Sequence, residues 1–140
     1  MSYVNQMDQV RCDAGTAIVV TGTGVVARFI NNGLHPVTVN AASYVIQVAS
    51  TVTPTVIAVK HRPTINSASG ETTITTLTVP TSAAIGKVLY KIGLDKIVKP
   101  GEEVVFDVTT ASTAGSGHFC LRTVPSWDQP GNLSNMILSA

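Results

Sequence analysis

Apolar and polar residues alternate along much of this 140-residue chain. The clearest alternation is VVFDVT at residues 104–109, where Val104, Phe106 and Val108 occupy every second position. A period of two places these three side chains on one face of a strand, and we expect that face to be buried against a second sheet. The preceding KPGE at 99–102 has Pro and Gly in the order of a type II turn. Residues 94–110 therefore predict a strand–turn–strand hairpin.

Short apolar runs predict further strands, and turn signals separate them. We expect strands at residues 16–21, 25–30, 37–40, 44–49, 56–62, 72–79, 87–92 and 118–124, with a kink at 41–43. Turn signals recur every ~8–12 residues, which is typical of antiparallel sandwiches and barrels. The sequence thus predicts an all-β fold, an antiparallel β-sandwich of immunoglobulin-like or jelly-roll-like type, over residues 16–125.

The two ends of the chain lack this periodicity. We interpret residues 1–15 as an extended N-terminal arm and residues 126–140 as a C-terminal tail. Both contain isolated apolar residues that are candidates for interaction: Tyr3, Val4, Met7 and Val10 in the arm, and Trp127, Leu133, Met136 and Ile137 in the tail. Such segments become ordered only where a surface takes up those side chains. We expect a neighbouring subunit, and hence a homo-oligomer, or another partner to supply it, with Trp127 as an aromatic anchor.

Charge and hydropathy exclude two classes of partner. Charged residues make up 12% of the chain and the net charge is +1, without the basic excess of nucleic-acid-binding proteins. We expect the lysines between residues 87 and 99 to form a solvated edge. The chain has no run of ~18 apolar residues that would span a membrane.

The N-terminal stretch shows no signal-peptide pattern, so we expect the protein to stay in the cytoplasm of the cell that makes it. In a reducing cytoplasm Cys12 and Cys120 are expected to be free thiols. A bridge between them would require the arm to fold back onto a late strand.

One motif resembles a cofactor site. Gly22-x-Gly24-x-x-Ala27 follows an apolar run, as in a dinucleotide-binding turn. That turn requires a helix from the second glycine and an acidic residue ~20 positions further on. Residues 28–36, RFINNGLHP, interrupt any helix, and no acid occurs at 42–47. We therefore predict a glycine hairpin between two strands and no cofactor.

Other combinations of reactive residues are explained better by structure than by catalysis. The three histidines are dispersed through the chain without metal-ligand spacing, and each is expected at a turn or on the surface of a strand: His35, His61 and His118. Ser116 lies near His118 in sequence, but a triad requires a base within hydrogen-bond reach and an oriented third group, and we interpret this stretch as a loop. Glu102, Glu103 and Asp107 are expected to form a solvated edge rather than a catalytic carboxylate pair. We expect no catalytic or metal-binding residues and no enzymatic activity.

The second half of the chain resembles a known family. Residues 85–90 (IGKVLY), 100–111 (PGEEVVFDVTTA), the loop at 114–117 and the Pro- and Asn-containing stretch at 125–136 are similar to head decoration, or cement, proteins of tailed bacteriophages. The resemblance implies a virion protein, made in the host cytoplasm, that binds the exterior of an assembled capsid and stabilises it. Its partner would be the major capsid protein, and no catalytic residues come with the resemblance.

A rival hypothesis places the protein elsewhere on the particle. A receptor- or glycan-binding module of a phage tail or fibre would use an exposed aromatic residue such as Trp127, Tyr44 or Tyr90. A high copy number in purified particles would indicate decoration and a low one a tail, and sugar-dependent quenching of Trp127 fluorescence would favour the tail or fibre.

Overall fold

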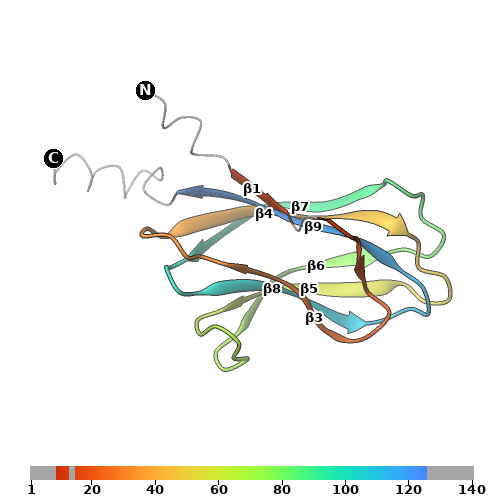
Figure 1. The fold of residues 1–140 in the computed structure, drawn as a ribbon, viewed down its shortest axis with the longest axis horizontal. Coiled ribbons are helices and arrows are strands. Elements are labelled where there is room, and N and C mark those ends of the chain that lie inside the picture. Colours follow the sequence, from red (N-terminus) through yellow and green to blue (C-terminus); the bar gives the residue numbers. More distant parts are fainter. Residues whose placement is uncertain (1–8, 13–14, 126–140) are drawn as a thin grey trace, which may run out of the picture.

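The computed structural model describes residues 9–12 and 15–125, which form nine strands in two antiparallel sheets that face each other (Figure 1). In sequence order the strands are β1 (Gln9–Cys12), β2 (Ile18–Val19), β3 (Gly24–Ile30), β4 (Val37–Val48), β5 (Thr55–Arg62), β6 (Thr72–Val79), β7 (Val88–Val98), β8 (Glu103–Thr110) and β9 (Ser116–Pro125). The predicted all-β antiparallel class is confirmed. Within these residues no helix is long and apolar enough to cross a membrane.

The strand order divides the chain between the two sheets. The first sheet has the order β1-β9-β4-β7, with β2 also paired to β9, and the second has the order β3-β8-β5-β6. Four of the pairings are nested: β1 with β9, β3 with β8, β4 with β7, and β5 with β6. In these four pairs, strands from the first part of the chain pair with strands from the second part in reverse order, as the two arms of one long hairpin would. The pairings of β4 with β9 and of β5 with β8 then join these pairs into the two sheets.

The apolar faces of both sheets meet in one core. Val104, Phe106 and Val108 are all buried in it, as the alternation predicts. Phe106 of β8 lies at the centre of a chain of rings, with centroids 5.7 Å from Phe29 and 4.7 Å from Phe119. These contacts join the two sheets, since β3 and β8 belong to one sheet and β9 to the other.

Tyr44 extends the ring chain and depends on a glycine. Its ring centroid lies 4.8 Å from that of Phe119. A Cβ atom added to Gly117 would collide with the Tyr44 ring and with the carbonyl oxygen of Val45. Only glycine therefore fits at this point of β9. Burial raises the pKa of Tyr44 to about 12, and its hydroxyl has no hydrogen-bond partner within the described residues.

The predicted turn at 99–102 is confirmed, but the hairpin around it is wrong. The Glu102 amide donates a hydrogen bond to the Lys99 carbonyl at 3.0 Å, and Gly101 has a φ of 85°. However, β7 lies in the first sheet and β8 in the second, so the turn connects two layers. The glycine hairpin predicted at Gly22 and Gly24 is wrong for the same reason, because β2 pairs with β9 and β3 with β8. A turn sequence does not specify which sheet the next strand enters.

Two further boundaries differ from the prediction. β4 runs without a break through residues 41–43. Its register shifts between Val39 and Ala41 and, against β9, also between Ile46 and Val48. The predicted arm is wrong for Gln9–Cys12, because these residues form β1 and pair with β9. The pairing takes this end of the arm into the first sheet.

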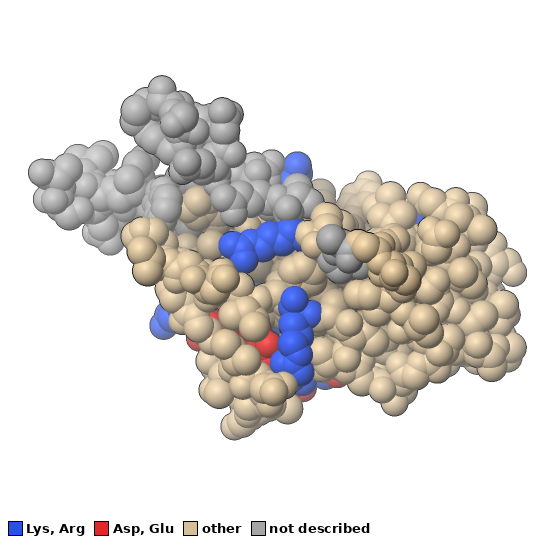
Figure 2. Space-filling view, in the orientation of Figure 1, with Lys and Arg blue, Asp and Glu red and all other residues tan. Residues whose placement is uncertain are grey.

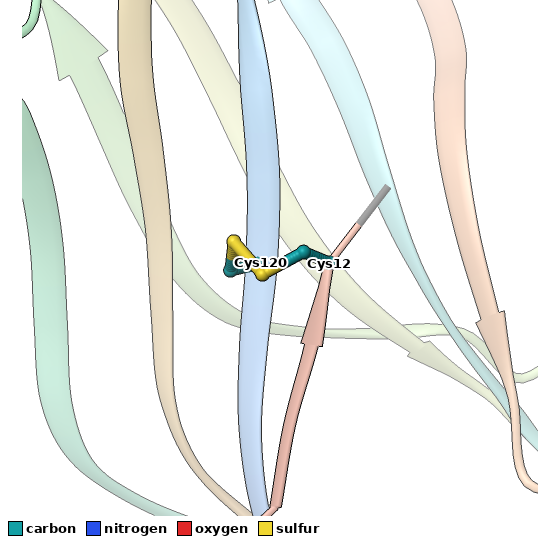
Figure 3. Close-up of a disulfide and its surroundings, with 2 residues drawn as sticks. All are labelled: Cys12 and Cys120. Carbon is teal, nitrogen blue, oxygen red and sulfur yellow. A yellow bond between two sulfur atoms is a disulfide. The ribbon is translucent and has the colours of Figure 1, made fainter. Parts of the chain in front are cut away.

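The two cysteines are bonded to each other. Cys12 of β1 lies directly opposite Cys120 of β9, with the Cα atoms 4.1 Å apart, and a disulfide joins them (Figure 3). The expectation of free thiols is therefore wrong. The arm folds back onto a late strand, which is the arrangement that a bridge requires.

Candidate interaction surface

Strand β7 forms an edge of the first sheet and exposes a row of apolar side chains. Val88, Tyr90 and Ile92 are 47%, 61% and 72% exposed, and their spacing of two places them on one face of the strand. We call these three residues the β7 stripe. Ile85, just before the strand, is 73% exposed. Contiguous exposed apolar surface of this kind marks interaction sites more often than isolated apolar residues do.

Two hollows flank the stripe, and Tyr90 lines both. The first, of about 310 Å³, is lined by Ala41, Ser43, Tyr90, Ile92, Cys120, Leu121 and Arg122. The register places Tyr90 beside Ser43 and Ile92 beside Ala41, so small side chains of β4 leave room next to large ones of β7. The second, of about 360 Å³, lies between β6 and β7 and is lined by Thr76, Leu77, Thr78 and residues 88–91.

The surroundings of the stripe are weakly basic. Lys87 and Lys91 are exposed, as expected for a solvated edge, and residues 72–92 contain no acid. With two lysines and no carboxylate in this segment, a partner of the β7 stripe would be recognised chiefly by apolar contact and hydrogen bonds. Elsewhere on the molecule, the face shown in Figure 2 also has few charged side chains in its described part.

The outer face of the second sheet is organised differently, around a buried carboxylate. Glu103 is fully buried and accepts hydrogen bonds from Arg28 Nη1 at 3.0 and 3.1 Å and from the Asn66 amide at 2.9 Å. The Arg62 Nη1 atom lies 3.8 Å from the same carboxylate. The expectation that Glu103 is solvated is thus wrong, because long side chains of the neighbouring strands cover it. Val105, which lies between Arg28 and Lys60 in the register, is also buried.

A second set of ion pairs continues across this face. Lys60 Nζ lies 2.8 Å from Asp107 and 3.2 Å from Glu71, and Arg62 Nε lies 2.9 Å from Glu71. The hydrogen bond to Asp107 is the main cause that raises the pKa of Lys60. Burial acts to raise the pKa of Glu71, but the hydrogen bonds from Arg62 and Lys60 outweigh it and lower that pKa. Each of these charged groups is paired with one of opposite charge. Such a network is typical of a structural role, here holding the connection at residues 63–71 on the sheet.

One histidine belongs to the interior of the sandwich. His61 is 8% exposed, and its Nε2 lies 3.0 Å from Glu102 Oε1. The same carboxylate oxygen accepts a hydrogen bond from the Lys99 amide at 2.8 Å. Burial acts to raise the pKa of Glu102, but these two hydrogen bonds outweigh it and lower the pKa. The predicted surface position is therefore wrong for His61, which supports the turn at 99–102.

Most of the predicted interaction residues are not placed by the structure. Seven lie outside the described residues: Tyr3, Val4, Met7, Trp127, Leu133, Met136 and Ile137. Val10 lies in β1 opposite Arg122. Tyr44 is fully buried and has no surface for a ligand, whereas Tyr90 is exposed. In residues 9–12 and 15–125, no group of three His, Cys, Asp or Glu side chains is arranged to hold a metal ion.

The β7 stripe was missed in the sequence although a signal exists. Val88, Tyr90 and Ile92 alternate, but Leu89 lies between them and is packed against the core. With apolar residues on both faces, the sequence does not reveal which face is exposed.

Comparison with protein-family models, with curated proteins and with solved structures finds no match.

Proposed function

We propose that this protein is a non-enzymatic virion structural protein that binds the exterior of an assembled phage capsid and stabilises it. The observation that carries the proposal is the β7 stripe, in which Tyr90 and Ile92 are 61% and 72% exposed beside two hollows. A protein with 12% charged residues that presents such a surface is suited to a large, weakly charged protein partner. The proposed partner is the major capsid protein.

We infer further that the fold is a jelly roll rather than an immunoglobulin-like sandwich. The nested pairings of β1 with β9, β3 with β8, β4 with β7, and β5 with β6 support this inference, since a jelly roll is a long hairpin rolled into two sheets. Jelly rolls occur in viral capsid domains and in lectins. A fold does not determine function, so this analogy is compatible with both hypotheses.

Two other features support a role on a particle. Residues 85–90, which resemble the decoration family, include the first part of the β7 stripe. Contacts of modest strength gain avidity when many copies bind a repeating shell. The Cys12–Cys120 disulfide suits a protein that acts after leaving the reducing cytoplasm.

Binding to capsids is tested by co-sedimentation with empty heads assembled from the major capsid protein alone. Ile92→Thr should reduce the bound fraction, because it replaces an apolar side chain of the stripe with a smaller, polar one that is also β-branched. Val52→Thr is a matched control, since Val52 is 70% exposed but lies in the loop between β4 and β5. Thermal melts establish that both variants fold. Equal binding by the wild type and both variants would refute the role of the stripe, and the absence of binding by the wild type would refute the function.

The second candidate function is a receptor- or glycan-binding module of a tail or fibre. It is favoured by one observation, the exposed ring of Tyr90 at the boundary of two hollows, because sugars stack on exposed aromatic rings. A titration with oligosaccharides, followed by chemical-shift changes, should then affect Tyr90 and be lost in Tyr90→Ala. A high copy number in purified particles indicates decoration of the shell, whereas a low one indicates a tail.

A further inference from the structure

Strand β6 has an open edge of unusual composition. It is the last strand of the second sheet and pairs only with β5 among the described strands. Its sequence, TTITTLTV, contains five threonines, three apolar residues and no charge. β-Branched residues favour extended structure. An exposed strand edge presents unpaired backbone groups to any other strand.

The other edge strands carry features that prevent pairing. In β7, the register passes from Ile92 to Lys96 across an irregular segment in which Gly93 and Asp95 have φ of 71° and 50°. The strand also carries Lys91. Edges are commonly protected by bulges and by lysine in this manner.

The remaining edges are protected as well. β3 has a register shift between Val25 and Ala27 and carries the charged side chain of Arg28. β1 is only four residues long, and a very short edge strand offers little backbone for pairing. β6 has a shift at one end only, at Ile74, which leaves residues 75–79 regular. An unprotected edge among protected ones suggests that β6 is covered in the working form of the protein.

The surface next to β6 adds exposed apolar side chains to the open edge. Residues 72–92 form one continuous segment of 21 residues: β6, its connection to β7 and the first part of β7. The segment includes the exposed side chains of Ile85, Val88 and Tyr90, and the hollow of about 360 Å³ lies between its two strands.

We propose that β6 of one copy pairs antiparallel with β6 of a second copy across a two-fold axis, joining the two four-stranded sheets into one of eight strands. A strand without charge pairs with itself without repulsion between like charges. It offers no charge pattern that would select a foreign strand. A two-fold pairing covers the β6 edge of each copy with the β6 edge of the other, so the assembly closes at two copies. The proposal concerns the protein alone and does not depend on the proposed function.

The alternation of side chains indicates the register. With Leu77 opposite the partner's Leu77, Thr76 of each copy lies opposite the partner's Thr78. Leu77 faces the core and is 1% exposed, whereas Thr76 and Thr78 are exposed on the outer face. This register pairs threonine with threonine, and cross-strand threonine pairs are favourable. It also keeps apolar residues on the core side of the joined sheet.

Sedimentation of the full chain tests the dimer. The wild type should sediment as a dimer at tens of micromolar. The double variant Thr76→Lys/Thr78→Lys places lysines opposite each other twice and should weaken association by at least about tenfold. Thr21→Lys/Thr23→Lys is the matched control, because these two threonines are exposed in the connection between β2 and β3, and it should remain dimeric. A monomeric wild type, a trimer or larger ring, or an unchanged dimer in Thr76→Lys/Thr78→Lys would overturn the proposal.

Cross-linking tests the register. A mixture of the Thr76→Cys and Thr78→Cys variants should form a disulfide between copies, because directly opposite Cα atoms lie roughly 4.5–5.5 Å apart, within disulfide range. Each variant alone should form little, because diagonal neighbours are roughly 7–8 Å apart. The native cysteines are already paired and do not compete. Equal cross-linking of single variants and mixture would overturn this register, and no cross-linking in the mixture would overturn the pairing.

Discussion

Replacing both cysteines, by Cys12→Ser and Cys120→Ser, should substantially lower the free energy of unfolding. The bridge joins residues 108 positions apart, so it restricts the unfolded chain with a very long loop. The chain-entropy relation, with this loop length at 25 °C, gives a stabilisation of roughly 4.8 kcal/mol. For a domain of this size that corresponds to a decrease of roughly 15 °C in the melting temperature. The folded state also loses the covalent link that holds the four residues of β1 on β9.

Urea unfolding of three samples measures this contribution: the oxidised wild type, the wild type reduced with dithiothreitol, and the Cys12→Ser/Cys120→Ser variant. The reduced wild type and the variant should agree, and the variant should not respond to dithiothreitol. Alkylation of the unfolded protein verifies the thiol state of each sample. A difference below about 1 kcal/mol between oxidised and reduced wild type, with the bridge shown to be intact, would refute the reasoning that loop closure dominates.

Further predictions concern the core and the ion pairs. Phe106→Ala should cost about 3–5 kcal/mol in urea unfolding, because its ring contacts both sheets; a loss below 1 kcal/mol would contradict that position. Gly117→Ala should cost about 3 kcal/mol, whereas Tyr44→Phe should be neutral or stabilising because it removes a buried hydroxyl without a partner; the opposite order would be inconsistent with the contact. The pKa values of Glu71 and Glu102 are lowered in the folded protein, so their contribution to the free energy of unfolding is complete above about pH 4.5 and is lost as the pH falls further. The melting temperature should therefore decrease between pH 4.5 and pH 3 in thermal melts, and a constant melting temperature would argue against these contributions.

Local chemistry was sufficient to predict the class of fold and several of its parts. The turn at 99–102 follows from Pro100 and Gly101, whose backbone preferences depend on no distant residue. The burial of Phe106 follows from alternation. The sequence did not reveal that Val105 is buried on the opposite face, because its cross-strand neighbours, Arg28 and Lys60, lie on strands that are distant in sequence.

Long-range arrangement was the part that could not be predicted. The pattern around residues 94–110 is the same for a hairpin and for a connection between sheets, and only the pairing of β7 with β4 decides between them. The disulfide was missed because a separation of 108 residues carries no information on proximity. The β7 stripe could not be recognised for a related reason: both faces of β7 carry apolar residues, and only the packing of Leu89 against the core shows that Tyr90 faces outward.

The nested pairing of the strands has a consequence for the order of folding. The β5–β6 pair is joined by nine residues, 63–71, so it closes the shortest loop and has the lowest entropic cost. Once it has formed, each outer pair (β4–β7, then β3–β8, then β1–β9) needs to close only a short additional segment. We expect folding to proceed outward from β5–β6, with the Cys12–Cys120 bond formed last, after the final strand has been synthesised. Quenching refolding with an alkylating agent at successive times should therefore find native-like β structure before the thiols disappear, and the reverse order would exclude this route.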